Sequence, residues 1–172
     1  FGMVDAASDE VLGRFHLDMQ PREAKYKHAA AFPVQTGVEG RQVPMAALVC
    51  NFPRADEPME HAQVQTFFHE FGHLIHHLFA GKHRWLGVSG FNTEWDFVEA
   101  PSQMLEEWAW DAESLKTFAS DAEGNRIPDE LIEKMNRARG FGKGLDVAHQ
   151  MFYAALSLNY YNRSPMSFEP TE

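Results

Sequence analysis

The amino-acid sequence predicts an α+β fold in which a small antiparallel sheet is followed by a mostly helical part. Residues 1–52 contain short runs in which apolar and polar residues alternate, as in strands with one buried face. Residues 60–80 and 94–161 instead repeat apolar residues at three-and-four spacing, which is typical of helices. With 172 residues and 44% hydrophobic content, the chain can bury one sizeable core. We therefore expect a single domain over residues 1–172.

Charge and composition exclude several classes of partner. The chain has 15 basic and 25 acidic residues, a net charge of −10, which disfavours nucleic acid and anionic membranes as partners. No run approaches the length of a membrane span, and no charged N-terminal region precedes an apolar run, so neither a span nor a signal peptide is expected. The lone Cys50 cannot form an internal disulfide and lies in an apolar run. We expect a buried thiol and a reducing, cytoplasmic compartment.

Two strand pairs are predicted in the first part of the chain. Residues 1–5 and 11–20 flank a turn-rich segment, and the second run alternates apolar and polar residues as V-L-G-R-F-H-L-D-M. Residues 28–35 and 42–52 flank a turn that contains glycine. We therefore expect two hairpins within one antiparallel sheet.

The rest of the chain is expected to form about five helices. The first, residues 61–79, has a wide apolar face and is followed by a glycine-containing loop, residues 80–93. The second begins near Val98 and carries Pro101, which a helix tolerates only in its first turn or at a kink. Three more helices are expected at residues 112–118, 129–138 and 145–161.

The first helix contains the pattern H-E-x-x-H, as His69-Glu70-Phe71-Gly72-His73. Histidines four apart on a helix lie about 6 Å apart along the axis and about 40° apart around it. Both imidazoles can therefore reach one ion at roughly 2.0–2.1 Å. Glu70 projects about 100° from His69, beside the ion, where it can take a proton from a water molecule. These residues predict half of a zinc site and its general base.

Three neighbouring residues on this helix bear on the site. Gly72 costs about 1 kcal/mol of helix propensity relative to alanine, a cost that makes sense if another backbone or the ion approaches closely there. His76 and His77 lie near the face that carries His69 and His73. We considered them as extra ligands, but a surface or supporting role is favoured.

A catalytic zinc ion usually takes three protein ligands and a water molecule, so a third ligand is required. A carboxylate among apolar neighbours is costly unless a positive group meets it, which favours Glu99, early in the second helix. Glu106 lies on the same face and could hydrogen-bond a ligand histidine. The residues alone leave open whether these carboxylates form a solvated helix face instead. The candidates by spacing are Glu94, Asp96, Glu99, Glu106 and Glu107.

Four segments carry a family resemblance: L-D-M-Q-P-R-E-A-K-Y-K-H-A-A-A-F, R-Q-V-P-M-A-A-L-V-C-N-F, H-E-F-G-H-L-I-H-H-L-F and S-G-F-N-T-E-W-D-F-V-E-A-P-S-Q-M-L-E-E-W. They resemble the zinc metallopeptidase family of thimet oligopeptidase, neurolysin, oligopeptidase A and peptidyl-dipeptidase. The resemblance implies one zinc ion per chain with ligands His69, His73 and Glu99, and Glu70 as general base. It also implies a zincin-like catalytic core that cleaves short peptides in the cytosol or an organelle.

The sequence departs from this family in two respects. Ala24 and Lys27 stand where the family usually has glycine, so the turn before the second hairpin is expected to differ in shape. Full-length members also have a helical N-terminal lobe and a later segment of the kind G-Y-D-A-x-Y-Y-G-Y, which binds substrate and stabilises the tetrahedral intermediate. This chain ends in residues 164–170 instead, so we expect a catalytic-core fragment of a larger two-lobed protein. Tyr160 and Tyr161 are expected to be ordinary helix residues.

The sequence therefore predicts a zinc-dependent metallopeptidase acting on short oligopeptides. The sheet edge near residues 45–52 is expected to align an extended peptide by strand addition. An alternative is a zinc-binding but inactive module, because the segment that resembles the oxyanion donors is missing. Surfaces exposed by the truncation are expected to favour self-association. A third hypothesis is a helical domain with a fortuitous motif and no metal.

Overall fold

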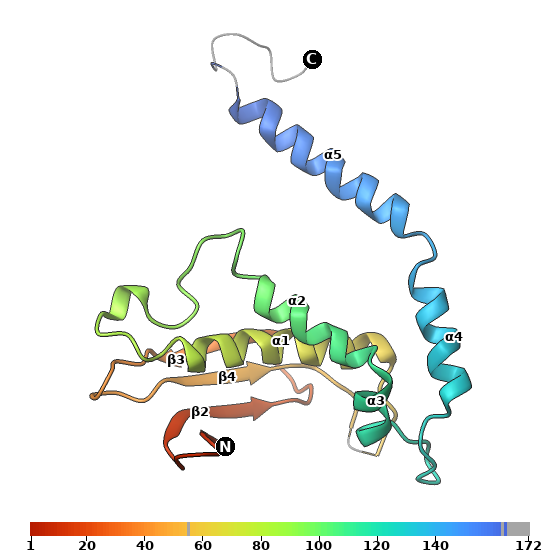
Figure 1. Cartoon of the computed structure of the whole chain (residues 1–172), viewed down its shortest axis with the longest axis horizontal. Coiled ribbons are helices and arrows are strands. Elements are labelled where there is room, and N and C mark those ends of the chain that lie inside the picture. The colour runs from red at the N-terminus through yellow and green to blue at the C-terminus, as the bar shows by residue number, and fades with distance from the viewer. Residues whose placement is uncertain (55, 163, 165–172) are drawn as a thin grey trace. The chain divides into compact units, whose positions relative to one another are not determined.

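The computed structural model describes residues 1–54, 56–162 and 164. Contacts between residues divide the chain into two units, Phe1–Ile127 and Pro128–Glu172. Among the described residues, the first unit contains a four-stranded sheet, three α-helices and two short 3-10 helices, and the second contains two α-helices (Figure 1). The α+β fold class predicted from the sequence is confirmed.

The sheet has the strand order β1-β2-β4-β3. Its strands are β1 (Gly2–Val4), β2 (Val11–Asp18), β3 (Ala30–Gln35) and β4 (Met45–Val49). Both expected hairpins form, because β1 pairs antiparallel with β2 and β3 pairs antiparallel with β4. The expectation of a wholly antiparallel sheet is wrong, because the two hairpins join through a parallel pairing of β2 with β4.

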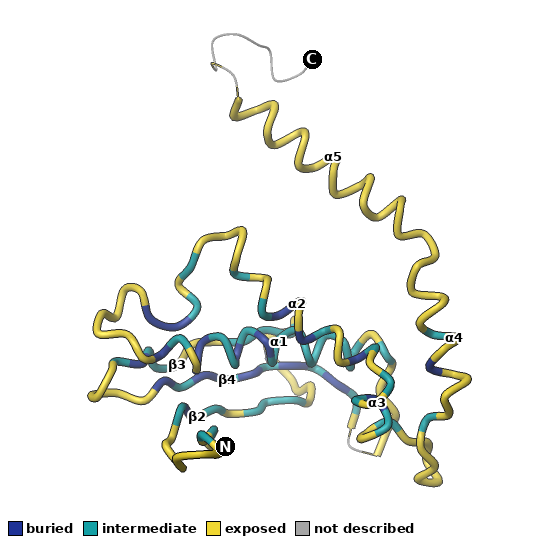
Figure 2. The backbone as a smooth tube through the Cα atoms, in the orientation of Figure 1, coloured by how far each residue is buried: buried dark blue, intermediate teal, exposed yellow. Residues whose placement is uncertain are grey.

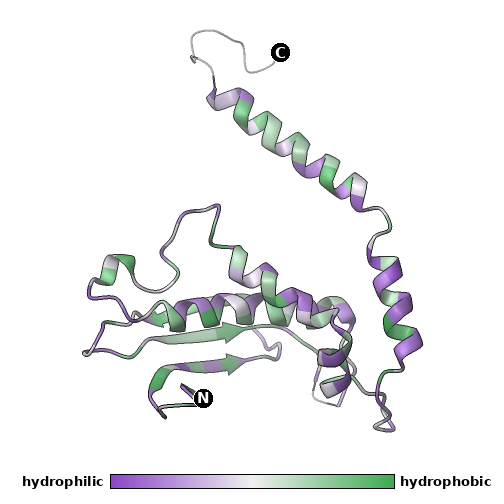
Figure 3. Ribbon diagram, viewed as in Figure 1, coloured by the Kyte–Doolittle hydropathy of each residue, from purple (hydrophilic) through white to green (hydrophobic). Residues whose placement is uncertain are grey.

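The sheet edge also lies elsewhere than expected. β4 is flanked by β2 and β3, so the segment near residues 45–52 is central and the edge strands are β1 and β3. β4 reads M-A-A-L-V, which is apolar at every position (Figure 3) and suits a strand with neighbours on both sides. Alternation along a sequence predicts strands and tight turns, but it does not determine which hairpin strands become neighbours.

Helix α1 (His61–Phe79) packs on the sheet, and α2 (Ala100–Glu106) packs on α1. Buried residues concentrate along β4 and α1 (Figure 2). The hydrophobic core between the sheet and α1 contains a cluster of six buried residues: Ala46, Leu48, Cys50, Phe52, Leu74 and Leu78. The expected buried thiol is confirmed, and burial raises the pKa of Cys50 to about 11. At neutral pH the thiol is therefore an uncharged part of the core.

Gly72 lets the backbone of α2 approach α1 closely. A Cβ atom at Gly72 would lie 2.5 Å from the Cα of Ser102 and 2.8 Å from the carbonyl oxygen of Pro101. Any side chain there would push the two helices apart, so the expected close backbone approach is confirmed. Pro101 lies in the first turn of α2, as expected, where its missing N–H breaks no helical hydrogen bond.

A buried lysine fastens the segment between β2 and β3. The Nζ of Lys25 donates to the main-chain oxygens of Asp18, Gln20 and Cys50, and to the Asp18 carboxylate. The preceding Ala24 has a φ of 60°, a left-handed conformation that costs a non-glycine residue roughly 1–2 kcal/mol. Ala24 thus adopts a backbone conformation that glycine takes more readily, and whether the turn differs from that of the resembled family stays a prediction.

The later α-helices lie close to their expected positions, beginning with α3 (Ala112–Phe118) in the first unit. Two short 3-10 helices were not expected: η1 (Leu86–Val88), within the segment expected to be a loop, and η2 (Glu107–Ala109), directly after α2. The second unit contains α4 (Asp129–Arg139) and α5 (Lys143–Tyr161), and α5 includes Tyr160 and Tyr161 as expected. Of the expected end segment, residues 164–170, all but Ser164 lies outside the described residues. Among the helices described, none combines the length and hydropathy that crossing a bilayer requires.

The packing of α1 on α2 predicts that Gly72→Ala destabilises the chain. Overpacking against a backbone typically costs about 1–3 kcal/mol, which exceeds the roughly 1 kcal/mol that alanine gains in helix propensity. Urea unfolding of the metal-free chain measures the effect. Gly87→Ala is the matched control, because a Cβ atom there meets no atom within 4 Å. Equal, small effects of the two substitutions would contradict the close approach.

Candidate metal centre

The two histidines of the motif and Glu99 converge on one point. His69 and His73 lie one turn apart on α1, with ring centroids 4.9 Å apart. Glu99 immediately precedes α2, and its Oε2 lies 3.2 Å from the Nε2 of His69 and 3.2 Å from the Nε2 of His73. One ligand atom from each residue lies within 4.8 Å of the other two. We call these three residues the ligand cluster.

The spacing and chemistry of the ligand cluster fit a zinc ion. Ligand atoms at 2.0–2.1 Å from a tetrahedral zinc ion are roughly 3.3–3.4 Å apart. The two separations between Glu99 and the histidines, 3.2 Å each, are close to this value. Two imidazole nitrogens and one carboxylate oxygen also form a donor set that catalytic zinc sites use, with a fourth position open.

Glu106 binds the ring nitrogen of His69 that does not face Glu99. The Nδ1 of His69 lies 2.6 Å from the Oε1 of Glu106 at the end of α2. An ionised carboxylate can only accept a hydrogen bond, so Nδ1 of His69 is the donor, and Nε2 is the ring nitrogen that faces Glu99. The expected hydrogen bond between Glu106 and a histidine of the motif is confirmed, whereas the role of His69 as a ligand stays a prediction.

Glu99 is the most exposed member of the ligand cluster. Its side chain is 49% exposed, so the expectation that apolar surroundings would single it out is wrong. The residue precedes α2 and therefore escapes the buried face of that helix. The hydroxyl of Ser102 donates to the Glu99 carboxylate at 2.9 Å and to its main-chain oxygen, which fixes the side chain.

Glu70 lies beside the ligand cluster. Its Oε2 accepts a hydrogen bond of 3.0 Å from the main-chain N–H of Ala31 in β3. Pro33 lies two residues further along β3, so its main-chain nitrogen is on the same side of the strand as that of Ala31. A proline, which has no N–H, is usual at a position that does not bond to a neighbouring strand. The carboxylate therefore meets the free edge of the sheet. It also borders a cavity of about 440 Å³, lined by Ala62, Gln65, Thr66, His69, Glu70 and Glu106.

Comparison with known proteins decides the family. A family model described as peptidase family M3 matches residues 1–171. The chain belongs to this family. A thimet-like oligopeptidase of Dictyostelium discoideum is 35% identical over 99% of this chain and 27% of its own length. Saccharolysin of Saccharomyces cerevisiae is 34% identical over 94% of this chain and 24% of its own length, and oligopeptidase A of Escherichia coli is 36% identical over 84% and 22%. This M3 chain thus spans about a quarter of the length of these relatives.

The other candidates for metal binding stay outside the ligand cluster. His77 is 2% exposed and its Nε2 lies 3.0 Å from the main-chain oxygen of Gln35, so it supports the end of β3 and is not a surface residue. The ring of His76 packs near Phe97, and burial lowers the pKa of this imidazole. The remaining carboxylate candidates are exposed: Glu94, Asp96 and Glu107.

Two contacts at the site were not predicted from the sequence of this M3 chain. The Nε2 of Gln65 donates to the Oε2 of Glu106 at 2.5 Å. Gln65 lies four residues before His69, on the same helix face, and that spacing could have revealed it. The hydrogen bond from Ala31 to Glu70 uses a main-chain group, which leaves no trace in a sequence pattern.

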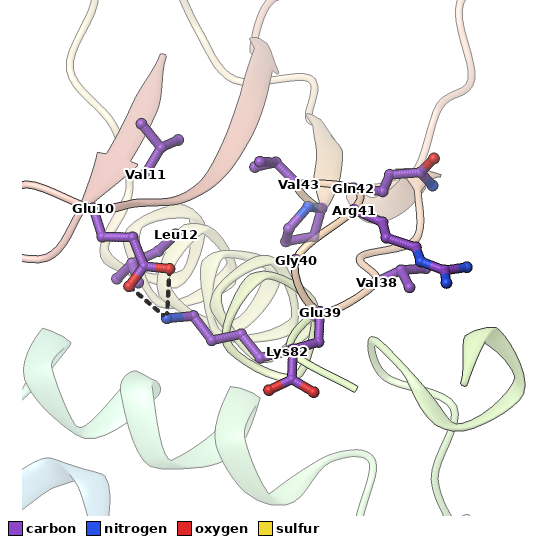
Figure 4. Close-up of a pocket in the computed structure, with 12 residues that line it drawn as sticks. Glu10, Val11, Leu12, Val38, Glu39, Gly40, Arg41, Gln42, Val43 and Lys82 are labelled. Atoms are coloured by element: carbon purple, nitrogen blue, oxygen red, sulfur yellow. Dashed lines mark hydrogen bonds and ion pairs between the residues drawn. The ribbon is translucent and has the colours of Figure 1, made fainter. Parts of the chain in front are cut away.

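A second cavity lies away from the ligand cluster (Figure 4). It measures about 280 Å³ and lies between the start of β2, the hairpin joining β3 to β4, and the segment after α1. The Nζ of Lys82 lies 3.1 Å from both carboxylate oxygens of Glu10 at its wall. None of the ligand cluster residues lines this cavity.

Loss of Glu99 should weaken zinc binding far more than loss of Glu94. Glu99→Ala removes the expected third ligand, and we expect the dissociation constant for zinc to rise by more than about 100-fold, since loss of an outer partner alone costs 10–100-fold. Competition with a chromophoric chelator measures the constant. Glu94→Ala is the control on the same segment, and a larger effect there would show that the third ligand is misassigned.

Proposed function

We propose that the chain carries the catalytic centre of a zinc-dependent peptidase that hydrolyses short oligopeptides, with one zinc ion held by His69, His73 and Glu99. The observation that carries the proposal is the ligand cluster, with Glu70 lining the same cavity as His69, in a chain of peptidase family M3. Two relatives bear the names thimet-like oligopeptidase and oligopeptidase A, which supports short peptides as the substrate class.

Glu70 is the proposed general base. When bound, zinc would polarise the scissile carbonyl and make a neighbouring water molecule more acidic. Glu70 accepts the proton of the attacking water and later delivers it to the leaving amine. The hydrogen bond from Ala31 aims the Glu70 carboxylate, and Glu106 keeps the His69 ring oriented. These contacts hold the reacting groups in position before substrate arrives, which is where much of the rate gain of an enzyme originates.

The free edge of β3 is the proposed place where the peptide is aligned. β3 is an edge strand, and its Ala31 amide already faces Glu70. In an antiparallel pair the N–H and C=O of one residue point to the same side, so the carbonyls of Ala31 and Pro33 face the free edge as well. Both can accept hydrogen bonds from an extended peptide that adds to the sheet beside the general base.

Charge and thiol chemistry support the remaining parts of the proposal. A net charge of −10 opposes binding to nucleic acid and anionic membranes. The buried and unpaired Cys50 suits a reducing compartment such as the cytoplasm. Exposed aromatic side chains, such as Trp85 and Trp95, support self-association of the isolated chain.

The second candidate is a module that binds zinc without hydrolysing peptides. It is the alternative that the sequence leaves open, and it concerns the isolated chain, which spans about a quarter of the length of its relatives. Loss of a single oxyanion donor typically lowers kcat by about 10²–10³, so a centre without its full surroundings turns over slowly. Hydrolysis of a quenched fluorescent peptide that stops with chelator supports the peptidase. Zinc binding without hydrolysis supports the module, and a chain without zinc overturns both.

Glu70→Gln should retain zinc and lose activity in the active form of the protein. The amide keeps the shape of the side chain but cannot accept the proton of water, and general-base catalysis contributes typically 10²–10⁴-fold to the rate. Elemental analysis measures the zinc content, and steady-state kinetics give kcat. Glu94→Gln makes the same change at an exposed carboxylate and should leave both unchanged. Loss of zinc from Glu70→Gln would mean that Glu70 is a ligand.

A further inference from the structure

We propose that Gln65 is a positioning residue of the metal centre, acting on His69 through Glu106. The inference rests on the proposed zinc site and extends it by one residue. The two oxygens of the Glu106 carboxylate have different partners on α1. Oε2 accepts from the Nε2 of Gln65 at 2.5 Å, and Oε1 accepts from the Nδ1 of His69 at 2.6 Å.

The spacing of these partners explains why both can reach the same carboxylate. Gln65 and His69 lie four residues apart on α1 and therefore on one face. Glu106 approaches that face from α2, so each of its oxygens meets a different turn of α1. The terminal torsion of a glutamate side chain is soft and takes a broad range of angles. Two donors fix this torsion, whereas one donor leaves the carboxylate free to turn about it.

The side chains of Glu106 and His69 are partly buried, which strengthens the effect of their hydrogen bond on the orientation of the His69 ring. The side chain of Glu106 is 21% exposed and that of His69 is 25% exposed, so water competes only in part for the same hydrogen bonds. Gln65 is also a neutral donor. It fixes the carboxylate without neutralising it, so the negative charge of Glu106 remains directed at the imidazole proton. A ligand histidine whose other nitrogen donates to a carboxylate is a stronger and better oriented ligand.

A simpler role for Gln65 would be to fasten α1 to α2. That role predicts that removing the amide lowers the stability of the metal-free chain and has no separate effect on zinc. The positioning role predicts weaker zinc binding beyond any change in stability. Thr66 offers a matched control, because it lines the same cavity, whereas its hydroxyl donates to Ala62 of its own helix at 2.9 Å.

The test compares Gln65→Met, which keeps the length of the side chain and removes the donor, with Thr66→Val. For each chain we would measure the dissociation constant for zinc, the free energy of unfolding without metal, and the NMR signal of the His69 Nδ1 proton without metal. Gln65→Met should weaken zinc binding about tenfold, the lower end of the range for outer partners, and move or broaden the His69 signal. Thr66→Val should change neither the dissociation constant for zinc nor the His69 signal.

A double-mutant cycle tests the route through Glu106. If Gln65 acts through this carboxylate, Gln65→Met should have no further effect on zinc binding in a chain that already carries Glu106→Ala. Equal zinc affinities of Gln65→Met and Thr66→Val, or an undiminished effect of Gln65→Met in the Glu106→Ala background, would overturn the inference. A wild-type chain that binds no zinc would instead overturn the proposed function, and the His69 signal would still report whether Gln65 orients the ring.

Discussion

The backbone contact between Gly72 and Ser102 is the packing constraint on which the proposed metal centre depends. A Cβ atom at Gly72 would lie 2.5 Å from the Cα of Ser102, so only a residue without a side chain allows α2 to lie this close to α1. The two histidines come from α1, whereas Glu99 immediately precedes α2 and Glu106 is the last residue of α2. Separations of 3.2 Å between the histidines and Glu99 require this close approach.

The two faces of α1 carry different groups of functional side chains. Toward α2, the helix presents His69 and His73, and the carboxylates of the neighbouring helix orient or complete the ligand cluster. Toward the sheet, Glu70 meets the amide of Ala31 at the edge of β3, and His77 meets the main-chain oxygen of Gln35 at the end of that strand. The helix is thus fixed from both sides. The proposed ligands and the proposed base are held by different layers of the fold.

Much of this arrangement could be predicted from the sequence, and each exception has its own physical reason. Local periodicity placed the strands and helices within a few residues, and helix geometry placed His69 and Glu70 in their relative positions. The parallel pairing of β2 with β4 could not be predicted, because it depends on which hairpin strands meet after the chain has turned. The exposure of Glu99 follows from its place just before α2, and boundaries are the least certain part of a helix prediction. The amide of Ala31 carries no side-chain signal.

Anomalous diffraction at the zinc edge, from crystals of the zinc-loaded chain, shows directly which residues bind the ion. We predict one peak per chain, about 2.0–2.1 Å from the Nε2 atoms of His69 and His73 and about 2.0–2.2 Å from a carboxylate oxygen of Glu99. Glu70 would lie nearby without contacting the ion. A peak bound by His76 or by Glu70, or one that Glu99 does not reach, would contradict the claim that the packing of α2 on α1 completes the metal centre.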